Sequence, residues 1–551
     1  MTPAQLSDLI VASLADLSAG GAISLPAGAP ESVTVERPRQ KGHGDYATNV
    51  ALQLAKGAGM TPRDLAELVA DRLRAAEGIA GVETAGPGFL NISVDAGAQG
   101  VVADDIVAAG SAYGSSDVLA GVKVNVEFIS ANPTGPLHLG HTRWAAVGDA
   151  LARVLAAAGA EVDREFYIND RGAQMDTFGD SVLARSLGRE VPAGGYHGEY
   201  VADLAQAVLA GRPDILGLPD AERRVAFREE AYRIQLGQQQ DELAEFHTTF
   251  DVWFSERGLH DDQSVVDNLE KLRGEGHLYD ADGAVWMRTT DFGDDKDRVL
   301  IRSNGELTYF ASDTAYYLDK RARGFDRCIY LLGADHHGYV GRLRAMAACA
   351  GDDPDANIEV LIGQLVKIVQ GGVELKLSKR AGTLVTLREL IDLIGVDPLR
   401  YTLARFPADS PLTLDAAEMT RQASDNPVHY VQYAHARVCS ILRNAAELGL
   451  APASHPDLLT HELEGELLRA LAELPRVVSA AATLREPHRV ARYLEDTAAT
   501  YHRFYDSCRV LPMGDEEPTD LHRARLRLVE ATRVVLANGL GLLAVSAPDR
   551  M

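Results

Sequence analysis

The ten residues 132–141, which read NPTGPLHLGH, constrain the fold of this chain more than any other segment. The β-rich run VKVNVEFIS (122–130) precedes them, and apolar residues at helical spacing follow them until Gly159. A second β-like run occupies 162–168. The order of strand, turn, helix and strand predicts a βαβ unit with a phosphate-facing turn at the start of its helix.

Two motifs suggest chemistry on a phosphate. His138 and His141 are three residues apart on the expected first helical turn, where the helix dipole favours an anion, and Gly140 would let a nucleotide approach the backbone. The later run KLSKR adds Lys376 and Lys379 in a loop flanked by glycines. Activation of a carboxylic acid by ATP needs such donors, because charge develops on the α-phosphate and on pyrophosphate. Taken alone, the histidines could be residues near a helix cap, and KLSKR could be a solvated basic turn. Together, the two motifs favour activation of a carboxylic acid by ATP.

These motifs resemble the two signatures of class I aminoacyl-tRNA synthetases, and the surrounding text is similar to the arginyl-tRNA synthetase family. The similarity includes VEFISANPTGPLHLGH, YINDRGAQMD, FDVWFSE, GADHHGY, KLSKRAGTLVTL and DPLRY, and it covers nearly the whole chain. It implies an arginine-tRNA ligase that activates L-arginine with ATP to arginyl-adenylate and transfers it to the 3′ end of tRNA(Arg). It also implies Mg²⁺ bound through the ATP phosphates and activation that waits for bound tRNA.

The resemblance assigns roles to individual residues. The catalytic residues are His138, His141, Lys376 and Lys379. The ATP contacts are Pro136, His138, Leu139, Gly140, His141, Ser378 and Lys379. The arginine contacts are Glu127, Ser130, Asn132, Tyr309, Asp313 and His337. Carboxylates suit this substrate, because they pair with the fork of donors on a guanidinium and so distinguish it from an ammonium group.

Two of these assignments have alternatives. Asp313 could instead cap a helix running through 314–320, in which case its carboxylate would bind backbone N–H groups. Asp335, His336 and His337 suggest a metal site, but no third ligand has suitable spacing, so we predict no protein metal site.

Composition limits the compartment and the partners. The four cysteines are scattered without a CxxC pair, the first residues lack a secretion signal, and no run is long enough for a membrane span. We therefore expect a cytoplasmic protein, and we expect a monomer. The formal net charge of −25 argues against a nucleic-acid partner unless positive residues are concentrated locally.

Candidate tRNA contacts are correspondingly few. Arg37, Arg39 and Lys41 form one basic segment, and Arg485, Arg489 and Arg492 share one face of an expected helix, although a solvated surface would look the same. Tyr430 and Tyr433 could stack on unpaired bases, but their spacing favours the core of a bundle. The tRNA contacts we name are Arg39, Lys41, Tyr430, Tyr433 and Arg489.

The chain is too long for one core, and we expect an α/β protein of three domains. Residues 1–112 form a small α+β module, which resembles the additional N-terminal domain that contacts the tRNA elbow in the family. Thr61 and Pro62 make a cap and first-turn pair, so we expect a helix over 61–75 in this module. Residues 113–400 alternate strand and helix patterns, as a Rossmann-like catalytic domain requires, with an inserted connecting subdomain near 190–290. After about residue 405 strand patterns vanish, and residues 401–551 resemble the all-α anticodon-binding domain. Its expected helices are 429–447, 463–483, 487–510 and 520–545.

Three other functions remain open. A class I synthetase of another specificity would keep both motifs and differ at Tyr309 and Asp313. An adenylate-forming ligase that needs no RNA would not need the long helical C-terminal part. A non-catalytic RNA-binding paralogue would have no need to retain the histidines and lysines of the two motifs.

Overall fold

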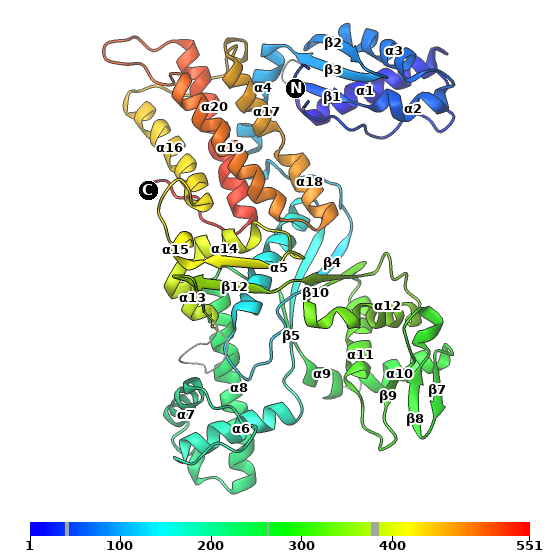
Figure 1. The fold of residues 1–551 in the computed structure, drawn as a ribbon, viewed down its shortest axis with the longest axis vertical. Helices are drawn as coiled ribbons and strands as arrows, with labels where there is room; N and C mark the ends of the chain where they lie inside the picture. Colours follow the sequence, from blue (N-terminus) through cyan, green and yellow to red (C-terminus); the bar gives the residue numbers. More distant parts are fainter. Residues whose placement is uncertain (39–42, 262–263, 376–384) are drawn as a thin grey trace.

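The computed structural model describes residues 1–38, 43–261, 264–375 and 385–551. Figure 1 shows an N-terminal unit at one end, a bundle of long helices beside it, and a central sheet that carries two lobes. Within the described ranges, no helix is both long and apolar enough to cross a membrane.

The N-terminal unit is a three-stranded antiparallel sheet, in the order β1-β3-β2, packed with three helices around its own apolar core. The helix predicted after Thr61 is confirmed: the Thr61 hydroxyl accepts from the backbone N–H of Asp64, and Pro62 is the first helical residue. The elements are α1 (Pro3–Ala19), β1 (Tyr46–Thr48), α2 (Val50–Ala58), α3 (Pro62–Arg74), β2 (Ile79–Ala85) and β3 (Phe89–Val94).

The central sheet has five parallel strands in the order β11-β10-β4-β5-β6. Its βαβ unit β4-α5-β5 is the one predicted from the sequence, and the Rossmann-like fold class is confirmed. The strand order reverses between β4 and β10, which is where open α/β sheets bind ligands, at the carboxyl ends of the strands. The elements are β4 (Lys123–Glu127), α5 (Leu139–Ala157), β5 (Glu161–Ile168), β6 (Val252–Ser255), β10 (Arg327–Gly333), η4 (Ala334–Tyr339), α12 (Val340–Cys349) and β11 (Ile358–Gly363).

Two lobes interrupt the alternation of strand and helix. The first is helical and has its own core; it contains α6 (Ala173–Ser186), α7 (Glu199–Gly211), η2 (Ile215–Gly217) and α8 (Asp220–Glu245). The second contains α9 (Glu256–Asp261), α10 (Ser264–Gly274), β7 (Leu278–Ala281), β8 (Ala284–Met287), η3 (Thr289–Phe292), β9 (Arg298–Ile301) and α11 (Tyr309–Ala322). The stretch 190–290 thus includes parts of both lobes and also β6 of the central sheet. The boundaries that we placed at 112 and 400 remain predictions.

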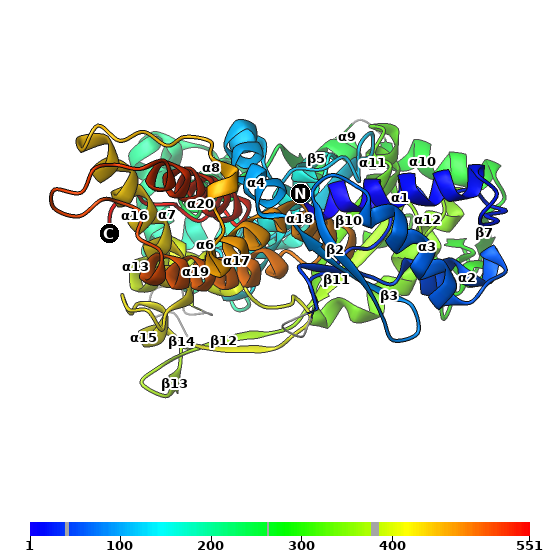
Figure 2. The ribbon, with the colours of Figure 1, turned by 90° about the horizontal axis from the view of Figure 1, so that it is seen from above.

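A small sheet follows the catalytic strands, so the expectation that strands vanish after about residue 405 is wrong. β14 pairs in parallel with β12, and Leu412 and Leu414 alternate inward from it. This four-residue strand is too short for its alternation to stand out from the helical patterns around it. The elements are β12 (Val366–Gln370), β13 (Val373–Glu374), α13 (Leu387–Ile394), α14 (Val396–Ala404), β14 (Leu412–Asp415) and α15 (Ala416–Met419). In Figure 2 this sheet extends along one side of the molecule.

The C-terminal part is a helical bundle, as predicted, and α4 from the N-terminal side packs against it. The expected helix 463–483 divides at Glu473, because Pro475 in the next turn cannot donate to the helical ladder. One apolar core joins α4, the bundle and α5. The elements are α4 (Ala96–Ala109), η1 (Gly110–Ala112), α16 (Pro427–Glu447), η5 (Pro456–Leu458), α17 (Glu462–Ala472), α18 (Leu474–Leu484), α19 (His488–Ser507) and α20 (Asp520–Leu542).

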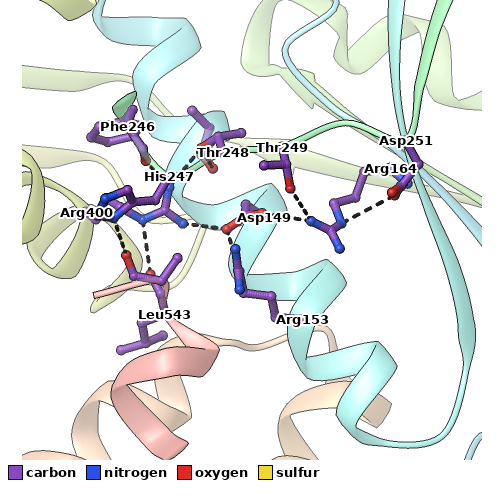
Figure 3. Close-up of polar contacts among 12 residues, drawn as sticks. Asp149, Arg153, Arg164, Phe246, His247, Thr248, Thr249, Asp251, Arg400 and Leu543 are labelled. Atoms are coloured by element: carbon purple, nitrogen blue, oxygen red, sulfur yellow. Dashed lines mark hydrogen bonds and ion pairs between the residues drawn. The ribbon is translucent and has the colours of Figure 1, made fainter. Parts of the chain in front are cut away.

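A buried ion pair fixes α5 against the C-terminal segments (Figure 3). Arg400 of α14 donates through Nη2 to Asp149 of α5 at 2.7 Å, and both side chains are completely buried. The same guanidinium donates to the carbonyls of Phe246 at 2.5 Å and Leu543 at 3.1 Å, and to the Thr248 hydroxyl at 2.8 Å. The Arg400 side chain therefore joins four segments that are distant in sequence: α14, α5, residues 246–248 and Leu543.

Close packing of α5 against the loop after β4 gives a first prediction. A Cβ at Gly148 would lie 2.5 Å from Cγ of the buried Phe128 ring, so Gly148→Ala should cost about 1–3 kcal/mol of unfolding free energy. Gly237→Ala in α8 is the matched control, because nothing lies within 4 Å of that Cβ, and it should gain about 1 kcal/mol. Denaturant unfolding of both variants measures the difference, and equal stabilities would contradict the packing argument.

Candidate active site

The two histidines of the first motif lie at the start of α5, as predicted. His138 is the N-cap, and its Nδ1 accepts from the backbone N–H of Gly140 at 3.2 Å. His141 Nδ1 accepts from the His138 backbone N–H at 3.3 Å, and the two rings stack with centroids 3.7 Å apart. Since each Nδ1 is an acceptor, each neutral ring keeps its proton on Nε2.

Both imidazoles are neutral at physiological pH. Burial lowers the pKa of His138, and burial together with the neighbouring His138 lowers the pKa of His141 to about 3. The pair therefore offers two ring N–H donors without positive charge. Because the two histidines are neutral, the positive potential beside them comes from the amino end of α5.

The segment after the second motif is bonded directly to the first. The Leu139 N–H donates to the Val385 carbonyl at 3.0 Å, the Leu387 N–H donates to the Leu137 carbonyl at 2.8 Å, and Thr386 forms a bridge with His138. Leu139 is also buried in the core that contains Val385, so its side chain packs rather than faces a ligand. Lys376, Ser378 and Lys379 lie outside the described residues.

The loop that leaves β4 has an unusual backbone. Ile129 and Ser130 have φ values of 70° and 44°, in the left-handed region that a β-branched residue such as isoleucine rarely adopts. This turn brings the Ser130 hydroxyl back to the strand end, where it donates to Glu127 Oε1 at 3.0 Å and accepts from the Tyr167 N–H at 3.2 Å. Strain of this kind, about 1–3 kcal/mol per residue, is typical of functional sites.

Glu127 has an internal partner that the sequence did not reveal. The buried Lys320 donates Nζ to Glu127 Oε2 at 2.5 Å and lies over the rings of Tyr316 and Tyr330 at 4.2 and 4.1 Å. With Ser130 on the other oxygen, both oxygens of the carboxylate already accept a hydrogen bond. Glu127 therefore balances a buried ammonium group, and its carboxylate is not an uncommitted charge for a substrate.

The Asp313 carboxyl group has a pKa far above its usual value. It lies within α11, whose N-cap is Thr308, so the alternative in which Asp313 caps a helix is wrong. Burial raises the pKa of Asp313 to about 7, and the negative charges of Glu127 and Glu256 add to the effect. The hydroxyl of Tyr339 donates to Asp313 Oδ2 at 3.0 Å and opposes the shift.

Tyr309 lies one helical turn before Asp313, so the two side chains occupy one face of α11. The Tyr309 side chain is 72% exposed. Asn132 and His337 are exposed as well, and Asn132 donates to Gln174 Oε1 at 3.0 Å. Asn132 lies in the loop after β4, and His337 lies in η4 after β10.

Glu256 and Tyr167 belong to the site but were missed in the sequence. Glu256 follows β6, where its side chain is buried, and burial raises its pKa while a hydrogen bond from Tyr167 lowers it. Burial raises the pKa of Tyr167 far above its usual value, and Glu256, Asp313 and Glu127 contribute through their negative charge. A usable signal was present: Glu256 ends the run FDVWFSE, directly after a strand, where parallel sheets bind ligands.

The candidate base-stacking tyrosines are partly accessible. Tyr433 is 46% exposed, so the bundle-core interpretation is wrong for it, whereas Tyr430 is partly buried against the core. Arg437 donates to the Tyr433 hydroxyl at 2.8 Å and lies over the Tyr433 and Tyr505 rings at 4.7 and 4.6 Å. A nearby polar cluster of His435, Cys439 and Asp549 is hydrogen-bonded internally, with Cys439 Sγ donating to Asp549 Oδ1 at 3.3 Å.

The arginines and the lysine that we named as candidate tRNA contacts do not all lie where the sequence predicted. Arg485 does not share a helix face with Arg489, because α18 ends at Leu484 and Arg485 takes a left-handed conformation with φ 58°. Its side chain is largely buried and pairs with Glu359 at 3.1 Å. Arg489 is exposed in the first turn of α19, whereas Arg39 and Lys41 fall in a range that the structure does not describe.

Family models match all three parts of the chain. The arginyl tRNA synthetase N terminal domain matches residues 4–94, and the class I (R) tRNA synthetase catalytic domain matches 105–190 and 223–397. The DALR anticodon binding domain matches 431–551. Arginine–tRNA ligases from Frankia alni and Paenarthrobacter aurescens are 59% and 57% identical to this chain, and each comparison covers 100% of both proteins.

Solved structures agree at the level of fold. The arginyl-tRNA synthetase of Thermus thermophilus superposes with a TM-score of 0.76 at 24% identity, covering 99% of each chain. That of Plasmodium falciparum gives a TM-score of 0.72 at 16% identity, covering 99% of this chain and 98% of the other. With the segment 385–387 bonded to the histidine motif at the amino end of α5 and full-length relatives at 59% and 57% identity, the chain belongs to the arginyl-tRNA synthetase family.

Proposed function

We propose that this protein is an arginine-tRNA ligase whose cleft between β4 and β10 joins L-arginine to AMP and then to the terminal ribose of tRNA(Arg). The observation that carries the proposal is the position of Asp313. A partly buried carboxyl group of raised pKa, on a face shared with Tyr309, lies beside the strand ends that the histidine motif follows. A guanidinium is the natural partner for such a group.

The arginine pocket that we propose contains Asp313 as the main counter-charge. Glu256 adds negative potential, and Tyr339 orients the Asp313 carboxylate through its hydroxyl. Ser130, Asn132, Tyr309 and His337 remain candidate contacts. Glu127 contributes at a distance, because its charge is balanced by Lys320.

The first reaction needs positioning and charge stabilisation rather than a side-chain nucleophile. A carboxylate oxygen of arginine attacks the α-phosphorus of ATP, and the bond to the departing pyrophosphate breaks. We assign the Nε2–H groups of His138 and His141 and the amino end of α5 to the phosphates, with Pro136 and Gly140 beside the nucleotide. Lys376, Ser378 and Lys379 remain sequence-based proposals, and Mg²⁺ would arrive with ATP, held by its phosphates.

The tRNA contacts that we propose involve the N-terminal unit and the C-terminal bundle. In the N-terminal unit, a cavity of about 690 Å³ is lined by Phe89, which is 41% exposed, and by Asn91. An aromatic face beside an amide is a suitable receptor for an unpaired base. At the bundle, Tyr430 and Tyr433 are the corresponding candidates. We further propose that the protein acts as a cytoplasmic monomer.

Amino-acid-dependent exchange of pyrophosphate into ATP tests this function. Measured across all twenty amino acids with total tRNA present, exchange should depend on arginine alone, and charged tRNA should carry arginine. Exchange driven by another amino acid would indicate a different class I specificity. Absence of both exchange and charging would favour a non-catalytic RNA-binding protein, and ready exchange without tRNA would contradict the expected dependence on RNA.

A further inference from the structure

Two basic segments that are far apart in the chain line one cavity between the N-terminal unit and the bundle. The cavity has a volume of about 360 Å³. Arg37 lines it from the N-terminal side, and Arg476, Arg489 and Arg492 line it from α18 and α19. The sequence singled out Arg37 and the pair Arg489 and Arg492 separately, and the fold brings them together.

The lining is positive although the protein is strongly negative. Four guanidinium groups face two carboxylates, Glu473 and Asp496, in a chain whose formal net charge is −25. Glu473 is buried and already pairs with Arg476 at 2.5 Å. Such a local reversal of charge is the pattern that an acidic protein needs in order to bind a polyanion.

Within the described part of the chain, two of these arginines have no carboxylate partner. Among the residues with described positions, no carboxylate lies within salt-bridge distance of Arg37 or Arg492, and both side chains are exposed. Asp496 acts on both through its charge without a direct contact. Arg489, by contrast, is held by Glu486 at 2.5 Å. The first turn of α19 also lines the cavity, and the positive end of its helix dipole adds to the potential.

The position of the cavity identifies the kind of polyanion. α18, which lines the cavity, packs against α5, and Figure 1 shows α18 between the N-terminal unit and the central sheet. We propose that this inter-domain cavity binds backbone phosphates of the tRNA, with Arg37 and Arg492 as the contacting residues. The inference rests on the proposed function, because it takes tRNA as the substrate that must span these two parts.

Salt dependence of tRNA binding distinguishes phosphate contacts from other effects. Each lost phosphate contact should reduce the slope of log affinity against log salt by about 1. Arg37→Gln/Arg492→Gln loses two contacts, so a fourfold rise in salt should weaken its binding of tRNA about fifteenfold less than it weakens binding by the unaltered protein. The KM for tRNA should rise, while kcat and the KM for arginine at saturating tRNA should stay the same.

Three controls make the result specific. Arg302→Gln removes one exposed charge in the distant second lobe and should leave the slope unchanged. Arg37→Lys/Arg492→Lys should keep the salt slope of the unaltered protein, because phosphate attraction needs charge rather than a guanidinium fork. Unaltered thermal unfolding would show that the variants fold.

The outcomes separate this inference from the proposed function. An unchanged slope in a double variant that still charges tRNA with arginine would overturn the phosphate site alone. Failure of the unaltered protein to charge tRNA with arginine would overturn the function on which it rests. An equal loss of affinity for free ATP or polyphosphate would indicate a site for small anions and would also overturn the tRNA assignment.

Discussion

Asp313→Asn should lower kcat/KM for arginine by about a thousandfold, which corresponds to about 4 kcal/mol. The substitution keeps the size of the side chain and leaves an oxygen that can accept from the Tyr339 hydroxyl. It removes only the charge that we expect to pair with the substrate guanidinium in a buried position. Steady-state charging of tRNA with arginine, at saturating ATP and tRNA, measures the loss.

The matched control is Asp319→Asn on the same helix. Asp319 is a partly exposed carboxylate that pairs with Arg323 at 2.8 Å, so its removal should change arginine kinetics by less than about 1 kcal/mol. Most of the loss in Asp313→Asn should be in KM for arginine, with KM for ATP unchanged. Equal effects of the two substitutions would show that Asp313 has no special part in arginine recognition.

The pKa of Asp313 predicts a pH dependence of the same step. The folded protein holds this carboxyl group with a pKa of about 7, above its usual value, so below pH 7 most of the empty sites are protonated and uncharged. Arginine binds the ionised form, and kcat/KM should rise as pH increases through about 7 and then level off. In Asp313→Asn this rise should disappear, whereas in Asp319→Asn it should remain.

Local features of this site could be predicted from the sequence because they depend on nearby residues. The order of β4, α5 and β5 follows from apolar periodicity, and the position of His138 and His141 at the amino end of α5 follows from their place in that pattern. Thr61 and Pro62 identified the start of α3 for the same reason. Each inference needed only a window of about twenty residues.

Features that depend on long-range contacts could not be predicted in this way. Glu127 and Lys320 are 193 residues apart, and nothing near either of them indicates that they form a buried pair. Arg485 was assigned to a helix face although it lies between the expected helices 463–483 and 487–510, and no local signal indicates that its side chain pairs with Glu359, 126 residues away. Arg37 and Arg492 were each only weak candidates for tRNA binding in the sequence. They become a candidate phosphate site because the fold places both of them in the lining of one cavity.

The second large effect concerns stability. Asp149→Asn should reduce the unfolding free energy by about 3–5 kcal/mol, because it leaves the fully buried guanidinium of Arg400 without its counter-charge. Asp149 also accepts from Arg153 at 2.8 Å and lies 3.6 Å from Arg164, so one substitution removes a carboxylate charge that three arginines share (Figure 3). Burial lowers the pKa of Arg400, whereas the charge of Asp149 and its hydrogen bond raise it, so Asp149 favours the charged form of the guanidinium.

A double substitution tests whether the charge or the shape of this junction is responsible. Asp149→Asn/Arg400→Met removes both charges and keeps most of the buried volume, so it should recover much of the stability that Asp149→Asn loses. Asp251→Asn, at the exposed end of the same network and 3.5 Å from Arg164, should cost less than about 1 kcal/mol. Denaturant unfolding gives the coupling energy of the pair. If the double variant were as unstable as the sum of the two single variants, the carboxylate and the guanidinium would be independent, and the ion pair would not be what holds α5 to α14.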